Sequence, residues 1–303
     1  MKTTFEKLKP FIAPLLASII WGISFVAQKK ANTVGAFTVN ATRSFIAVLF
    51  LMVLTLVFTK GDVKHLFSEP DSKKTKALWL GGILSGAALF MATYLQQTGM
   101  NAGVEAGKSG FLTALYVVMV PVFGIFLRKK PHWTVWISVA LAVAGLYFLC
   151  VDGAFTLVPA DLLTIGCAFF YTLQILALDR FSPECNTTKL SSIMFLTCAV
   201  LSLVFAFVFE RGSFNAQGLL DATLPILYLA IFSSGVGYTL QILAQRSDAN
   251  PAVVSILLSM ESVFSVIAGA ILLSERLTGR QYLGCAFMFG AVILNVVLSA
   301  KNE

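Results

Sequence analysis

Residues 190–209 read LSSIMFLTCAVLSLVFAFVF, a stretch of twenty residues without a charged side chain. A helix of about 20 apolar residues is long enough to cross the hydrocarbon core of a bilayer. Lys189 precedes the stretch, and Glu210 and Arg211 follow it, so charge begins where the chain would reach the membrane surface. The stretch lacks the strict alternation of barrel strands, which leaves a transmembrane helix.

Similar stretches occur along the whole chain. Of its 303 residues, 57% are apolar and 12% are charged, whereas soluble domains carry about 25% charged residues. Breaks rich in charge, proline or glycine separate ten expected transmembrane helices. They cover residues 11–28, 34–58, 77–97, 107–127, 133–151, 159–178, 190–209, 222–244, 251–273 and 279–299. The sequence therefore predicts an all-α membrane protein with ten transmembrane helices.

Lysine and arginine in the loops predict the orientation of these helices. With a cytoplasmic N-terminus, fifteen of these residues lie in inner segments and six in outer loops. Short cytoplasmic loops are enriched in Lys and Arg, so this orientation is the expected one. We predict a multi-pass protein of the plasma membrane with both termini in the cytoplasm. The net charge of +7 is explained by these loops, and nucleic-acid binding is not expected.

Weak internal repetition divides the chain into two halves. Residues 94–97 (YLQQ) resemble residues 238–241 (YTLQ), and residues 136–145 resemble residues 282–291. These matches predict two five-helix repeats, 11–151 and 159–299. Because five is odd, the second repeat must enter the membrane in the opposite sense. Inverted repeats of this kind are typical of secondary transporters, which bind substrate between the halves.

A second repetition has a different spacing. The segment YTLQILA occurs at residues 171–177 and again at residues 238–244. A separation of 67 residues is too short for the duplication of five helices. The match indicates either two helices with similar surroundings or chance.

Motifs along nearly the whole chain resemble the EamA family of the drug/metabolite transporter superfamily. They are Trp21 to Lys29 (WGISFVAQK), Arg43, Ala106 to Phe111 (AGKSGF), Tyr116, Val120-Pro121, Gly153, Asp161, Gln241, Gln245-Arg246, Glu261 and Glu275. The resemblance implies ten helices, cytoplasmic termini, a central cavity shared by the halves, and export or exchange of metabolites such as amino acids. One departure is Ser262, where the family usually has proline. Without that proline we expect a straighter ninth helix with no hinge.

Two charged residues lie within expected helices. Glu261 is about eleven residues into 251–273, near the bilayer centre, where a charge costs roughly 2.5–3.5 kcal/mol and must face the protein interior. It is a candidate for proton coupling or for binding a substrate amine; the alternative is a buried acid that bonds across helices. Arg43 needs an acceptor, such as Glu261, a carbonyl or a substrate carboxylate, unless it extends toward a surface.

Aromatic and amide side chains share faces on four expected helices, at intervals of three, four or seven residues. An amide in hydrocarbon needs a hydrogen-bond partner, so these faces are expected to surround one polar cavity. Ordinary bonding between helices is the alternative for any single residue. The cavity candidates are Trp21, Ser24, Gln28, Tyr94, Gln97, Tyr171, Gln174, Tyr238, Gln241 and Gln245.

Two further features concern helix packing and movement. Gly82 and Gly86 form a small-xxx-small pair, which is typical of closely packed membrane helices. Pro121 lies inside the helix expected at 107–127, where it is a candidate for a kink that gates the cavity.

These features favour a secondary transporter that exports or exchanges a small metabolite by alternating access. The expected partners are this substrate and the lipid bilayer, and a homodimer is compatible with the sequence. No cofactor or metal is expected, because the five cysteines are single and the motifs include no ligand spacing. The alternatives are a receptor or assembly subunit without transport, and a membrane enzyme, which would need a catalytic cluster that the sequence does not display.

Overall fold

The fold is taken from a computed structural model, which describes residues 4–31, 33–104, 106–128, 131–151, 157–213, 215–246, 250–272 and 276–301. In these residues the elements are α1 Thr4–Lys30, α2 Ala36–Phe58, η1 Val63–His65, α3 Ser72–Asn101, α4 Ala106–Ala114, α5 Tyr116–Phe126, α6 Trp133–Cys150, α7 Pro159–Phe181, η2 Ser182–Glu184, α8 Thr187–Phe209, η3 Arg211–Ser213, α9 Ala216–Asp221, α10 Thr223–Tyr228, η4 Leu229–Gly237, α11 Tyr238–Gln245, α12 Pro251–Leu258, α13 Glu261–Leu272 and α14 Gly279–Lys301. All are helical, as the sequence predicts.

Nine helical segments of the described chain are long and apolar enough to cross a membrane. They are Phe11–Lys30, Ala36–Phe58, Ser72–Asn101, Lys108–Phe126, Pro159–Glu184, Thr187–Phe209, Thr223–Gln245, Pro251–Leu272 and Gly279–Leu298. A shorter apolar helix, Trp133–Leu149, occupies the remaining expected position. Helices therefore occur at all ten positions, while a tenth full-length span stays a prediction.

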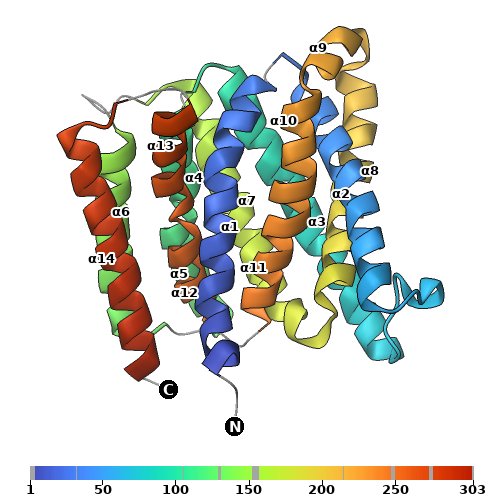
Figure 1. Ribbon diagram of the computed structural model, residues 1–303, viewed down its shortest axis with the longest axis horizontal. Coiled ribbons are helices and arrows are strands. Elements are labelled where there is room, and N and C mark those ends of the chain that lie inside the picture. The colour runs from blue at the N-terminus through green and yellow to red at the C-terminus, as the bar shows by residue number, and fades with distance from the viewer. Residues whose placement is uncertain are drawn as a thin grey trace.

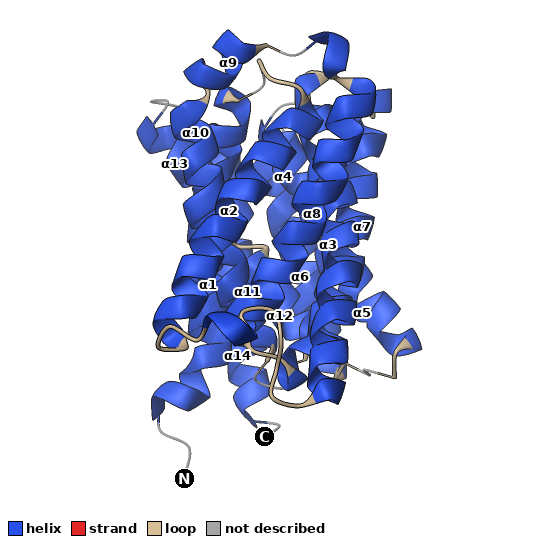
Figure 2. Ribbon diagram, turned by 90° about the vertical axis from the view of Figure 1, so that its right-hand side faces the viewer, coloured by secondary structure: helices blue, strands red, loops and turns tan. Residues whose placement is uncertain are grey.

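The long helices stand side by side in one bundle (Figure 1). Helix α1 begins and α14 ends at the same end of that bundle, and the view at a right angle agrees (Figure 2). Helices α6 and α14 pair at one edge, α2 and α8 pair at the other, and α1 runs between them. An even number of crossings would leave both ends of the chain on one side.

Helix α8, which contains the opening stretch of the sequence, has two apolar faces. Ile193, Met194 and Cys198 are buried against neighbouring helices, whereas a second stripe is exposed and equally apolar. This exposed stripe is Val200, Leu203, Val204 and Phe207. A helix that is apolar all round is expected to have lipid on its outer side.

The glycines of the expected packing motif lie where α3 meets α8. A methyl group at Gly82 would lie 2.5 Å from the Ile193 side chain, and one at Gly86 would lie 2.5 Å from the Met194 carbonyl oxygen. Larger residues would force the two backbones apart. The interpretation of Gly82 and Gly86 as packing residues is therefore confirmed.

Three membrane segments depart from a continuous α-helix near the middle of the bundle. Leu115 separates α4 from α5, Ser259 and Met260 separate α12 from α13, and Leu229–Gly237 forms a π-helix between α10 and α11. Breaks of this kind at membrane depth are tolerated where they line a cavity or are buried in protein. They direct attention to the space between these segments.

The expectation of a straight ninth helix without proline is wrong. Ser255 and Ser259 donate their hydroxyls to the carbonyls three residues back, those of Ala252 and Ile256. The amides of Met260 and Ser262 likewise bond three residues back, to Leu257 and Ser259. Serine back-bonding and tight i−3 bonds replace the regular i−4 ladder, so the helix is interrupted without proline.

Candidate functional site

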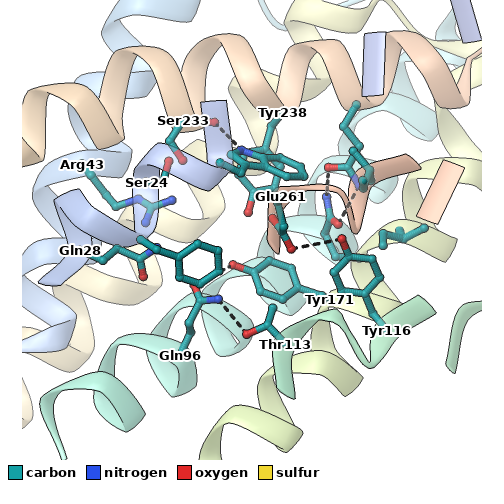
Figure 3. A pocket seen from close by; sticks show the side chains of 16 residues that line it. Ser24, Gln28, Arg43, Gln96, Thr113, Tyr116, Tyr171, Ser233, Tyr238 and Glu261 are labelled. Carbon is teal, nitrogen blue, oxygen red and sulfur yellow. Dashed lines mark hydrogen bonds between the residues drawn. The ribbon is translucent and has the colours of Figure 1, made fainter. Parts of the chain in front are cut away.

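The broken segments meet at a buried cavity of about 40 Å³ (Figure 3). Sixteen residues from both halves of the chain line it: Trp21, Ser24, Phe25, Gln28, Arg43, Gln96, Thr113, Tyr116, Tyr171, Gln174, Ile175, Ser233, Tyr238, Gln241, Leu258 and Glu261. This volume holds roughly three water molecules. The cavity must widen before it can accept a metabolite the size of an amino acid.

Glu261 and Tyr116 meet at two helix breaks. Each residue is the first of a half-helix, α13 and α5 respectively, and the Tyr116 hydroxyl donates to Glu261 Oε1 at 3.2 Å. The N-terminus of a helix carries a partial positive charge, which favours an anion there. The break before Glu261 thus places its carboxylate in the cavity, with a hydroxyl and a helix terminus to stabilise negative charge.

Arg43 supplies a positive charge to the same cavity from α2. Its side chain is buried, and Nε donates to Ser234 Oγ at 3.3 Å. Among the described residues, neither Arg43 nor Glu261 forms an ion pair. A guanidinium group and a carboxyl group therefore line one cavity, each with a neutral hydrogen-bond partner (Figure 3).

The π-helix shapes the wall that faces α1. The Trp21 indole N–H donates to the Ser233 carbonyl oxygen at 3.1 Å, and its ring lies 4.7 Å from the Tyr238 ring. A methyl group at Gly237 would come within 2.6 Å of Trp21 Nε1. Gly237 thus leaves room for the indole, and π-helical segments are frequently found at functional sites.

Two glutamines form a reciprocal amide pair across the cavity wall. Gln174 Nε2 donates to Gln241 Oε1 at 3.3 Å, and Gln241 Nε2 donates to Gln174 Oε1 at 3.2 Å. They occupy the same place in the two YTLQILA segments. The two segments therefore meet at this amide pair, and whether their match reflects similar surroundings or chance stays open.

A second hydrogen-bonded group lies on the opposite wall. Gln96 Nε2 donates to Thr113 Oγ1 at 3.0 Å, and the Tyr171 hydroxyl donates to Gln96 Oε1 at 3.4 Å. This group connects α3, α4 and α7. The buried amide consequently has a donor and an acceptor, as burial in a low-dielectric interior requires.

The cavity includes nine of the residues that the sequence singles out: Trp21, Ser24, Gln28, Arg43, Tyr171, Gln174, Tyr238, Gln241 and Glu261. The other four lie outside its lining. Tyr94 stacks on Phe37 with ring centroids 4.0 Å apart, and Gln97 donates to the Gln28 carbonyl and to Asn101. Tyr94 and Gln97 therefore do not line this cavity, and their role in substrate binding stays a prediction.

Gln245 and Pro121 are the other two predicted site residues that do not line the cavity. Gln245 donates to the Ile175 carbonyl at 2.7 Å and does not line this cavity. Pro121 is buried inside α5, six residues beyond the break at Leu115. Its role in gating stays a prediction. Of the family motifs, Gly153 and Glu275 lie outside the described residues.

Four polar lining residues were not among the predicted cavity residues: Gln96, Thr113, Tyr116 and Ser233. Gln96 adjoins Gln97, which was predicted instead, and the two point about 100° apart on a regular helix. Thr113 and Ser233 are common polar residues on helices that the hydropathy presents as uniform. A π-helix also changes which side chains share a face, so periodicity could not have identified Ser233.

The part of the chain that the structure describes holds no group of three His, Cys, Asp or Glu side chains placed to bind a metal ion. The cavity instead offers one cation, one carboxylate, hydroxyls, amides and aromatic rings. These groups suit a small molecule that carries both charges and an apolar part.

A model of the EamA-like transporter family matches residues 8–151 and again residues 158–297. The chain belongs to this family. An uncharacterized transporter of Archaeoglobus fulgidus is 30% identical over 92% of this chain and 83% of its own length. A probable amino-acid metabolite efflux pump of Escherichia coli is 23% identical over 95% of each chain.

A solved crystal structure shares the fold of this EamA-family chain. It superposes with a TM-score of 0.78 at 17% identity and covers 97% of this chain and 98% of its own. The family and the names of these relatives indicate a multi-pass membrane transporter rather than an enzyme.

Proposed function

We propose that this EamA-family protein is a secondary transporter that exports or exchanges a small zwitterionic metabolite, such as an amino acid. The observation that carries the proposal is the pair Arg43 and Glu261, two opposite charges in one buried cavity with no ion pair between them. Arg43 would bind the substrate carboxylate, and Glu261 would bind the ammonium group or a coupled proton. A relative named as an amino-acid metabolite efflux pump supports the same class.

The proposed mechanism is alternating access of two five-helix halves that enter the membrane in opposite senses. Two observations support it: the family model matches each half, and the halves are broken at corresponding places, before Tyr116 and before Glu261. Tyr116 and Glu261 are 145 positions apart in the sequence, close to the offset of 144 positions between the YLQQ and YTLQ segments. The small volume of the cavity suits an occluded state between the two open ones.

The orientation and location belong to this proposal. The excess of lysine and arginine in the loops supports cytoplasmic termini and a place in the plasma membrane. The protein would act as a monomer or a homodimer. A gradient of the substrate or of protons would drive transport, with no bound cofactor.

A metabolite panel measured inside and outside cells tests the substrate class. Cells that overexpress the protein should release at least one amino acid or related zwitterion faster than control cells. Cells that overexpress the Arg43→Gln variant at the same membrane level are the matched control. Unchanged release of every zwitterion, or equal release by the variant, would contradict the proposal.

A further inference from the structure

A second hollow lies on the outside of the bundle, between α1 and α10. Its volume is about 200 Å³, and it is lined by Ile23, Val26, Ala27, Lys30, Leu224, Pro225 and Tyr228. The four residues of α1 follow at intervals of three, one and three, so they form one stripe of that helix. We call this hollow the α1–α10 groove. None of its lining residues contributes to the central cavity.

The α1–α10 groove and the central cavity share a wall. The Ile20 carbonyl oxygen accepts the Tyr228 hydroxyl at 2.8 Å and the Ser24 hydroxyl at 3.0 Å. Tyr228 lines the groove, and Ser24 lines the cavity. A molecule in the groove would therefore contact the backbone segment that supports one side of the cavity.

The chemistry of the α1–α10 groove specifies its occupant. Six of its lining residues present an apolar surface, and Leu224 at its edge is 78% exposed, so the groove opens toward the lipid. Lys30, the last residue of α1, is its single charged lining residue. Among the described residues Lys30 forms no ion pair.

We propose that the α1–α10 groove binds a phospholipid with an anionic headgroup. One acyl chain lies along Ile23, Val26 and Leu224, and the phosphate pairs with the Lys30 ammonium. A basic residue at a helix end beside an apolar hollow satisfies both parts of such a lipid. The neighbouring Lys29 is also exposed but does not line the groove, which gives a matched control.

The test measures lipid retained by the purified full-length protein in mild detergent, by native mass spectrometry. Phosphatidylglycerol and phosphatidylcholine with identical chains are supplied at equal concentration. Wild-type protein should prefer phosphatidylglycerol about five-fold, the ratio expected for one lysine at a membrane surface. Lys30→Gln should remove most of this preference, and Lys29→Gln should keep it. Elution volume and thermal midpoint verify that each variant is folded.

Three results would overturn the proposal. The first is equal retention of the two lipids by wild-type protein. The second is an equal loss in Lys30→Gln and Lys29→Gln, which would indicate diffuse surface attraction. The third is displacement of the lipid by inorganic phosphate at the same concentration as the lipid. That result would indicate an anion site that needs no acyl chain. None of these measurements depends on transport, so the proposal stands or falls separately from the transporter function.

Discussion

Single residues carry the chemistry of the central cavity, and two of them, Arg43 and Glu261, are ionisable groups of opposite sign. Both are buried, and in the part of the chain that the structure describes each forms one side-chain hydrogen bond, to Ser234 and Tyr116 respectively. An ionised group with so few partners inside a membrane protein is destabilising, because these hydrogen bonds offset only part of its desolvation free energy. A zwitterionic ligand would supply the missing partner to both residues. The proposed selectivity for molecules that bear both charges would follow from this arrangement.

Replacement of Arg43 by glutamine is expected to abolish recognition of the substrate carboxylate. A hydrogen bond to a charged group contributes about 1.5–3 kcal/mol, so KM for an amino acid should rise by roughly 10- to 100-fold. The amide of the same amino acid lacks the carboxylate and should be transported equally by wild type and variant. The measurement is initial uptake into proteoliposomes. A variant that still distinguishes the acid from its amide would remove Arg43 from the binding site.

At the scale of elements, the order and type of the helices were predictable from hydropathy, whereas their interruptions were not. The mean hydropathy stays high across Leu115, Ser259–Met260 and Leu229–Gly237, and the few polar residues there do not mark a break. Both the breaks and the π-helix depend on hydrogen bonds made by common residues, such as the Ser259 hydroxyl and the Trp21 indole. Of the residues chosen by spacing on an ideal helix, Trp21, Ser24 and Gln28 line the cavity, whereas Tyr94, Gln97 and Gln245 do not.

Replacement of Gly237 by alanine tests the fit between the π-helix and α1. The added methyl group would lie 2.6 Å from Trp21 Nε1, so the indole or the helix must shift. We expect a loss of about 1–3 kcal/mol, as is usual for overpacking, seen as a lower thermal midpoint in detergent. Gly212→Ala is the control, because no heavy atom lies within 4 Å of the added methyl. Equal midpoints for the two variants would contradict the close fit.

At the scale of the whole molecule, the proposed mechanism needs two halves that face opposite directions around one cavity. Both halves contribute a broken helix, and the residues after the breaks, Tyr116 and Glu261, bond to each other. The sequence repeat predicted this division from weak similarity. The contact itself was not predictable, since it depends on the rotation of two half-helices about their axes.

Labelling of single cysteines tests the expected orientation of this bundle. Val63 and Leu220 are exposed. The connection between α2 and α3, which includes Val63, and helix α9, which includes Leu220, lie at opposite ends of the bundle (Figure 1). A membrane-impermeant maleimide should label Leu220→Cys in intact cells and Val63→Cys only after the cells are opened. The unsubstituted chain measures labelling of the native cysteines. The reverse pattern would place the termini outside the cell.

Transport by purified protein in proteoliposomes tests the central claim most directly. Vesicles with wild-type protein should exchange a labelled amino acid against an opposing gradient, with a rate that depends on pH. The Glu261→Gln variant, reconstituted at the same level, should lose this exchange. Glutamine can neither form an ion pair with the substrate ammonium group nor release a proton. Exchange by Glu261→Gln at the wild-type rate and with the same pH dependence would contradict the account.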